Sequence, residues 1–125
     1  MTGQQVLVVE DNERNMKLFR EVLESSGYRT LEATTGKRAV ELVVEHCPDL
    51  VLMDIQLPDI DGVEALGRLR AEERTASVPV LALTAQAMDG DRERFLAAGF
   101  DGYLSKPVDI VDFVATVRRY CERGR

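Results

Sequence analysis

Four apolar runs in the sequence each end on polar side chains of types that take part in catalysis. A turn-forming role explains any one of these side chains, but threonine and lysine are not preferred turn formers, so it explains the whole set poorly. If the runs are strands of one parallel sheet, their carboxyl ends lie at the same edge and the side chains converge there. The residues are Glu10, Asp11, Asp54, Thr84 and Lys106.

The chemistry expected of this set is metal-assisted transfer of a phosphoryl group. Three crowded carboxylates repel one another unless a cation neutralises them, and Mg²⁺ takes a few carboxylates together with water and phosphate oxygens. Lys106 and Thr84 complete a site for an anion of the phosphate type, the first as a point charge and the second as a hydroxyl donor. One carboxylate must then accept the phosphoryl group. Asp54 is the better candidate because it stands alone at its strand end, while Glu10 and Asp11 can hold the metal.

The elements that position these residues alternate between strands and helices. Apolar runs with β-branched residues predict strands, and apolar residues at helical spacing between them predict helices. Five strands and five helices with short links imply an α/β fold, in which a central parallel five-stranded sheet is covered on both faces. The strands are expected at 5–9, 28–33, 50–54, 80–84 and 101–106, and the poorly amphipathic fourth helix at about 88–98.

The composition indicates one globular domain over residues 1–125, with no output domain. The 125 residues are enough for a core, and 45% hydrophobic and 30% charged residues are ordinary values. A net charge of −6 argues against direct DNA binding. No signal peptide and no apolar run of membrane-spanning length is present, which predicts a cytoplasmic protein without a membrane partner. The two cysteines, Cys47 and Cys121, fit no metal or redox spacing and are expected as small core residues.

Around the strand-end residues Glu10, Asp11, Asp54, Thr84 and Lys106, the sequence resembles response-regulator receiver (CheY-like) domains. The resemblance extends over essentially the whole chain. Members of that family have a flavodoxin-like three-layer (βα)5 fold with strand order 2-1-3-4-5. Segments 10–19 and 53–58 are especially similar to a single-domain regulator of cell division, and they also resemble receivers attached to hybrid kinases. The blocks that carry the resemblance are 9–12, 52–58, 61–62, 82–85 and 105–107.

The resemblance implies a stand-alone response regulator of a two-component system or phosphorelay. Asp54 would accept a phosphoryl group from a phosphohistidine on a histidine kinase or a histidine phosphotransfer protein. Mg²⁺, or Mn²⁺ in its place, would bind the side chains of Asp11 and Asp54 and the backbone carbonyl of Gln56, with Glu10 acting through water. The chain would catalyse only its own phosphorylation and dephosphorylation.

The same resemblance implies how phosphorylation is passed on. Lys106 would contact the phosphoryl group, and its bond to Pro107 is typically cis in the family. Thr84 would move to bond the new phosphoryl oxygen, with Tyr103 swinging inward behind it. The surface of the fourth helix, fifth strand and fifth helix would then change its affinity for a downstream protein partner.

Some residues around the site keep two interpretations. Gln56 and Gln86 either cap loops or tune how fast the aspartyl phosphate hydrolyses. Asn15 and Met16 either are plain helix residues or contact the histidine-bearing partner. Tyr103 considered alone is a strand residue with a half-buried ring, but its place three residues before Lys106 favours the switch role.

Three rival functions share features with a receiver. Haloacid-dehalogenase-like phosphatases need a second aspartate two residues beyond the nucleophile, where this chain has Gln56. An FMN binder needs a hydroxyl- or glycine-rich phosphate loop after the first strand, where residues 10–13 are largely acidic, and no Walker-type glycine loop occurs. An unphosphorylated receiver that serves only as an adaptor remains open, since an intact site can be idle.

Overall fold

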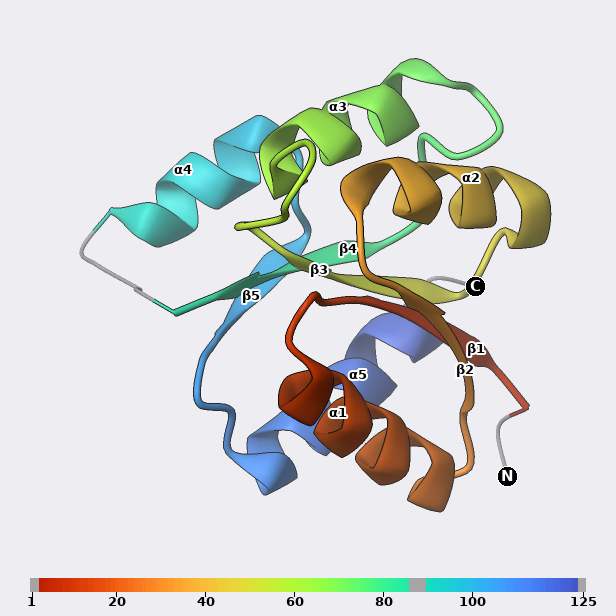
Figure 1. The fold of residues 1–125 in the computed structure, drawn as a ribbon. Coiled ribbons are helices and arrows are strands. Elements are labelled where there is room, and N and C mark those ends of the chain that lie inside the picture. Colours follow the sequence, from red (N-terminus) through yellow and green to blue (C-terminus); the bar gives the residue numbers. More distant parts are fainter. Residues whose placement is uncertain (1–2, 86–89, 124–125) are drawn as a thin grey trace.

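The computed structural model describes residues 3–85 and 90–123 (Figure 1). Five parallel strands form one sheet in the order β2-β1-β3-β4-β5. The predicted α/β fold and strand order are therefore confirmed. The elements are β1 (Gln5–Val9), α1 (Glu13–Ser25), β2 (Arg29–Ala33), α2 (Gly36–His46), β3 (Leu50–Asp54), α3 (Gly62–Ala71), β4 (Val80–Thr84), α4 (Asp91–Ala98), β5 (Gly102–Ser105) and α5 (Ile110–Arg123).

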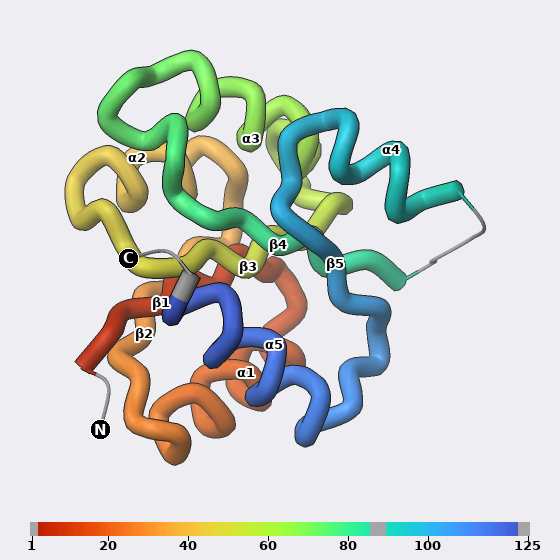
Figure 2. The backbone as a smooth tube through the Cα atoms, turned by 180° about the vertical axis from the view of Figure 1, so that it is seen from behind, coloured from red at the N-terminus to blue at the C-terminus, as the bar shows by residue number. Residues whose placement is uncertain are grey.

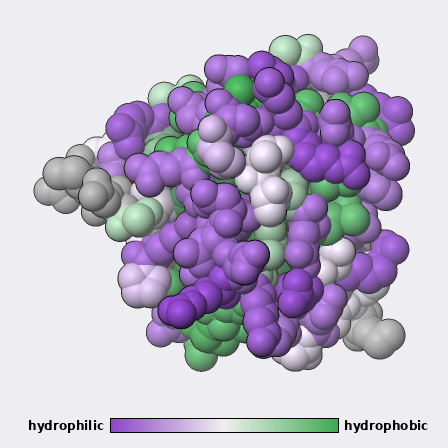
Figure 3. All heavy atoms as spheres, in the orientation of Figure 1, coloured by the Kyte–Doolittle hydropathy of each residue, from purple (hydrophilic) through white to green (hydrophobic). Residues whose placement is uncertain are grey.

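The sheet separates two apolar cores. Helices α2, α3 and α4 cover one face, and α1 and α5 cover the other (Figures 1 and 2). Successive side chains of a strand point to opposite faces, so Val6 and Val8 of β1 join the core under α1 and α5, while Leu7 and Val9 join the other core. The side of the molecule seen in Figure 3 is mostly hydrophilic.

Strand β3 lies in the middle of the sheet and is buried along its whole length. Its residues alternate between the two cores until Asp54, the first polar residue, which is paired with Leu83 of β4. Thr84 then pairs with Ser105, the residue before Lys106. Because all the strands are parallel, the register brings the ends of β1, β3, β4 and β5 to one edge of the sheet.

Side-chain caps fix the first turns of four helices, and at α5 the Asp109 carboxylate accepts a hydrogen bond from the Asp112 N–H at 3.1 Å. The side chains of Asn12, Thr35 and Asp61 each accept a hydrogen bond from a backbone N–H in the first turn, at α1, α2 and α3 respectively. Helix α4 follows Gly90, whose φ of 89° is left-handed, and it has no side-chain cap. None of the helices within the described part of the chain is long and apolar enough to cross a bilayer.

Several boundaries differ from those predicted. Helix α4 begins at Asp91, directly after Gly90 with its left-handed conformation, and the start predicted at about residue 88 lies outside the described residues. Strand β5 ends at Ser105, so Lys106 follows the strand instead of ending it. Cys121 is buried as expected, but Cys47 is exposed because it lies just after α2 in a left-handed conformation with a φ of 45°.

Gly62 brings the start of α3 against the end of β3. A Cβ atom on Gly62 would lie 2.6 Å from the carbonyl oxygen of Asp54 and 3.0 Å from the Cα of Ile55. The Gly62 N–H donates to the carbonyl of Ile55 at 2.9 Å, which closes the loop. Only glycine permits this approach without a shift of the backbone that carries Asp54.

Candidate functional site

A cavity of about 620 Å³ lies at the edge of the sheet where the strands end. Its walls come from the ends of β1, β3 and β4, from the first turn of α1, and from α4. The five strand-end residues singled out in the sequence all line it: Glu10, Asp11, Asp54, Thr84 and Lys106.

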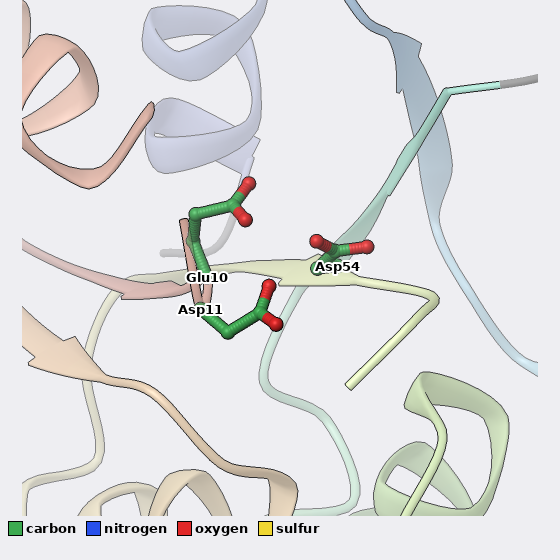
Figure 4. Close-up of side chains that lie close together, drawn as sticks. All are labelled: Glu10, Asp11 and Asp54. Atoms are coloured by element: carbon green, nitrogen blue, oxygen red, sulfur yellow. The ribbon is translucent and has the colours of Figure 1, made fainter. Parts of the chain in front are cut away.

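Three carboxylates gather in this cavity. Glu10, Asp11 and Asp54 each offer an oxygen, and these oxygens lie within 4.8 Å of one another. Figure 4 shows the three side chains at the ends of β1 and β3. Glu10 and Asp54 are only 1% and 6% exposed, whereas Asp11 is open to solvent. Because these like charges repel one another, the ionised group is stable only with cations nearby.

Lys106 supplies one cation to the group. Its Nζ donates hydrogen bonds to Glu10 Oε1 and, at 2.9 Å, to Asp54 Oδ2. Its backbone N–H donates to the carbonyl of Thr84 at 2.7 Å, and its peptide bond to Pro107 is cis. The lysine is thus held by its main chain and by both carboxylates.

The charges in the cavity shift the pKa values of two groups. Burial alone would lower the pKa of Lys106, but the hydrogen bonds to Asp54 and Glu10 outweigh it and raise the pKa. Burial raises the pKa of Glu10, more than the hydrogen bonds from Lys106 and from the Asn12 N–H lower it. The site therefore retains its lysine charge at neutral pH and is crowded with negative charge.

Each of the two buried carboxylates is held at both oxygens. Asp54 Oδ1 accepts from the Gln56 N–H at 2.9 Å, and Glu10 Oε2 accepts from the Asn12 N–H at 3.1 Å. Their other oxygens bind Lys106. The arrangement fixes how the Asp54 carboxylate faces the cavity.

The oxygen donors fit a hard divalent cation. Three carboxylates balanced by one lysine leave a net negative charge, and Mg²⁺ is commonly bound through one or two carboxylates with the rest of its shell from water and phosphate. The carboxylates close enough together to share such an ion are those of Glu10, Asp11 and Asp54, and Gln56 also lines the cavity. Bound there, Mg²⁺ would neutralise the carboxylates and the incoming phosphate oxygens.

The remaining predicted residues are distributed around this site. Thr84 is buried and lines the cavity, and Asn15 lines it from α1. Met16 is only 6% exposed and packs in the core under α1 and α5, so its burial removes it as a contact residue for a partner. Tyr103 is half-buried with its ring 5.8 Å from that of Phe95, and it lines a separate cavity. Gln86 lies outside the described residues.

Sequence reasoning missed three residues in or beside the site. Arg94 and Phe95 of α4 line the cavity, although nothing in the charged segment 91–94 distinguishes Arg94 from Arg92. Asp59, in the loop after Gln56, binds the start of a different helix. The signal that would have found Asp59 is its type, since a carboxylate suits a helix N-terminus.

Asp59 ties the loop that carries Gln56 to helix α2. Its carboxylate accepts hydrogen bonds from the backbone N–H groups of Gly36 at 2.8 Å and Lys37 at 3.0 Å. Desolvation opposes ionisation of Asp59, but hydrogen bonds from backbone N–H groups, including those of Lys37, Gly36 and Ile60, outweigh it and lower the pKa to about 2. A Cβ atom on Gly36 would meet the Ile60 side chain, so the loop also packs closely on this helix end.

We expect Asp59→Asn to reduce the loss of stability in acid. A carboxyl whose pKa falls from 3.8 to about 2 on folding stabilises the fold above its unfolded pKa, and this contribution is lost as the pH falls through the folded pKa. The urea midpoint, measured from about pH 6 down to about pH 2, should fall less steeply for the variant than for the wild type. Glu73→Gln, which removes an exposed carboxylate elsewhere, gives the effect of charge removal alone. Equal slopes for Asp59→Asn and wild type would contradict the role of Asp59.

Comparisons with known proteins agree on one family. Residues 6–118 match the model of the response regulator receiver domain. The polar-differentiation response regulator DivK of Brucella ovis is 48% identical over 115 residues, which cover 92% of this chain and 94% of that protein.

Solved structures show the same fold. The receiver domain of a sensor histidine kinase from Pseudomonas aeruginosa has a TM-score of 0.88 and 39% identity, covering 96% of this chain and 98% of its own. That crystal structure holds a magnesium ion coordinated in its active-site cleft. A receiver domain of a Francisella response regulator has a TM-score of 0.90 and 28% identity, with 98% and 99% of the two chains covered. With this fold, this cavity and these relatives, the chain belongs to the response-regulator receiver domain family.

Proposed function

We propose that this receiver domain acts as a stand-alone response regulator that takes a phosphoryl group from a phosphohistidine onto Asp54. The observation that carries the proposal is the single cavity in which Asp54 lies beside Thr84, Lys106 and two further carboxylates. The donor would be a histidine kinase or a histidine phosphotransfer protein, as two-component signalling implies. Asn15 on the rim contributes to the contact with it.

The reaction proposed at Asp54 is a displacement at phosphorus. A carboxylate oxygen of Asp54 forms a bond to phosphorus, and the bond from phosphorus to the donor nitrogen breaks. The electron pair of that bond leaves with the imidazole of the donor histidine. Lys106, already hydrogen-bonded to Asp54, contacts the transferred group, and the Thr84 hydroxyl donates to one of its oxygens.

Intact mass measurement tests the proposal. The purified chain is incubated with Mg²⁺ and acetyl phosphate, in which the carboxylate of Asp54 displaces acetate from phosphorus. The wild type should gain the mass of one phosphoryl group, and Asp54→Asn should not. Asp112→Asn, which removes an exposed carboxylate of α5, should gain mass as the wild type does. Absence of any gain with several donors would favour the unphosphorylated adaptor.

We also expect Mg²⁺ to stabilise the fold through Asp11. A ligand at about ten times its dissociation constant adds roughly 1.4 kcal/mol to the free energy of unfolding, or about 5 °C in Tm for a domain of this size. Asp11→Asn should lose most of this shift, and a chelator should reverse it in the wild type. The measured quantity is the shift caused by Mg²⁺, because removing one of three crowded carboxylates also changes the Tm of the metal-free protein. Mn²⁺ should substitute, and a full shift in Asp11→Asn would argue against this ligand set.

The signal would leave through the surface of α4, β5 and α5. A cavity of about 420 Å³ there is lined by residues of all three elements, among them Leu96, Tyr103 and Tyr120. Movement of Thr84 toward the phosphoryl group and of Tyr103 behind it would change affinity for a downstream protein, typically by about 1–3 kcal/mol. Gln56 and Gln86 are proposed to set the lifetime of the phosphoryl group. A cytoplasmic location and a role in cell division are part of this proposal, and the likeness to a response regulator of polar differentiation is in line with such a role.

A further inference from the structure

We infer that Arg94, in addition to Lys106, binds the phosphodonor in the Asp54 cavity. Arg94 lies on α4 and lines the same cavity as Asp54, Thr84 and Lys106. Figure 1 shows α4 beside the edge at which β3 and β4 end. The inference rests on the function proposed for Asp54 and names the residue that favours entry of the anionic donor.

The charges that line the cavity give Arg94 this role. Among the described residues of its wall, three carboxylates face two cations, Lys106 and Arg94. Lys106 is already engaged by Glu10 and Asp54. An approaching phosphate anion therefore meets a wall of negative charge in which Arg94 is the cation exposed to solvent, with 67% of its side chain accessible.

The position of Arg94 suits a contact that forms when the donor arrives. Its guanidinium pairs with Asp91 at 3.0 Å and lies 5.0 Å from the centre of the Phe95 ring. Phe95 is buried and itself lines the cavity, so it anchors this part of α4 to the wall. An ion pair with an exposed guanidinium is weak and exchanges readily with another anion.

The guanidinium also has the right shape for the task. Its N–H groups form a planar fork that donates two parallel hydrogen bonds to a phosphate, which an ammonium cannot do. Asn15 of α1 lines the same cavity as Arg94 of α4. A donor phosphoryl group would thus enter between α1 and α4, with Arg94 reducing its repulsion from the carboxylates before Asp54 attacks.

The kinetics of phosphorylation by acetyl phosphate in the presence of Mg²⁺ separate binding of the donor from the transfer of its phosphoryl group. The rate constant of phosphorylation is measured against donor concentration, by acid quenching and intact mass, because the chain has no tryptophan to report the reaction. Arg94→Gln should raise the half-saturating donor concentration roughly three- to tenfold and leave the maximal rate constant near the wild-type value. Arg94→Lys, which retains the charge without the fork, should lie between.

Arg92→Gln is the matched control. Arg92 is two residues away on the same helix and carries the same charge, but it lines the cavity beside Tyr103 instead. It should show wild-type donor kinetics, and both variants should have similar Tm values. Equal effects of Arg92→Gln and Arg94→Gln, or no effect of either, would overturn the inference. A wild type that gains no phosphoryl group would instead overturn the function proposed for Asp54, and this inference with it.

Discussion

Replacing Lys106 with methionine should slow phosphorylation of Asp54 by roughly 10²- to 10³-fold, the usual effect of losing one group that stabilises developing charge. Lys106 Nζ is hydrogen-bonded to Asp54 Oδ2 at 2.9 Å, so it stands beside the attacking carboxylate. Methionine has a similar length and fills similar space, but it carries no charge and donates no hydrogen bond. Rapid mixing with acetyl phosphate and Mg²⁺, followed by intact mass, measures the rate.

The same substitution should lower the free energy of unfolding by roughly 2–4 kcal/mol, since it leaves a buried carboxylate without its partner. The carboxylate most affected is Glu10, which is 1% exposed and binds the lysine through one oxygen. Added Mg²⁺ should stabilise Lys106→Met by more than it stabilises the wild type, because the ion then replaces the missing cation.

Two variants separate the local effect of Lys106 from a general one. Lys17→Met removes the charge of an exposed lysine on α1 and should leave both rate and stability near the wild-type values. Lys106→Arg retains the charge and should recover much of the stability, though not the full rate, because its donors have a different geometry. Wild-type kinetics in Lys106→Met would remove the lysine from the proposed reaction.

Replacing Gly62 with alanine should destabilise the fold by about 3 kcal/mol, at the upper end of the usual cost of overpacking. The new methyl group would lie 2.6 Å from the Asp54 carbonyl oxygen and 3.0 Å from the Ile55 Cα. Both are backbone atoms, which cannot rotate away as a side chain can. Relief requires movement of the chain at Asp54, so phosphorylation should slow as well. Urea unfolding and the acetyl phosphate assay measure the two effects.

Gly67→Ala is the matched control on the same helix. Nothing lies within 4 Å of a Cβ atom at Gly67, and this residue is inside α3. Alanine there should raise stability by up to about 1 kcal/mol, because glycine loses more backbone entropy in a helix. Opposite signs are therefore expected for the same substitution five residues apart. A stable and fully active Gly62→Ala would show that the start of α3 can move independently of β3.

The parts of the site that sequence predicted are those fixed by the sheet. An apolar run buried on both faces must end where the first polar residue appears, and this placed Asp54 and Thr84 at strand ends. Because the carboxyl ends of parallel strands lie at the same edge of a sheet, Asp54 and Thr84 were then predicted to lie near Glu10 and Asp11. These inferences needed no side-chain geometry, only the alternation of the chain and the topology it implies.

The parts that sequence did not predict depend on packing between elements. Helix α4 has charged residues at 91–94 and few apolar ones, so its periodicity does not specify which side faces the site. The burial of Phe95 decides this, and it places Arg94 rather than Arg92 at the cavity. Packing also decides the places of two neighbours on α1. Asn15 lines the cavity, whereas the side chain of Met16, one residue further along the helix, packs in the core.

The two hydrogen bonds on Asp54 have a consequence for the activation entropy of its reaction. A free carboxylate rotates about its bond to Cβ and presents both oxygens equally, whereas here an amide N–H holds Oδ1 and an ammonium holds Oδ2. Its rotational freedom is lost when the chain folds, and the lone pairs keep a fixed direction before any donor arrives. The encounter with a donor then requires ordering of the incoming molecule alone, which is how a preorganised nucleophile shortens the search for a reactive geometry.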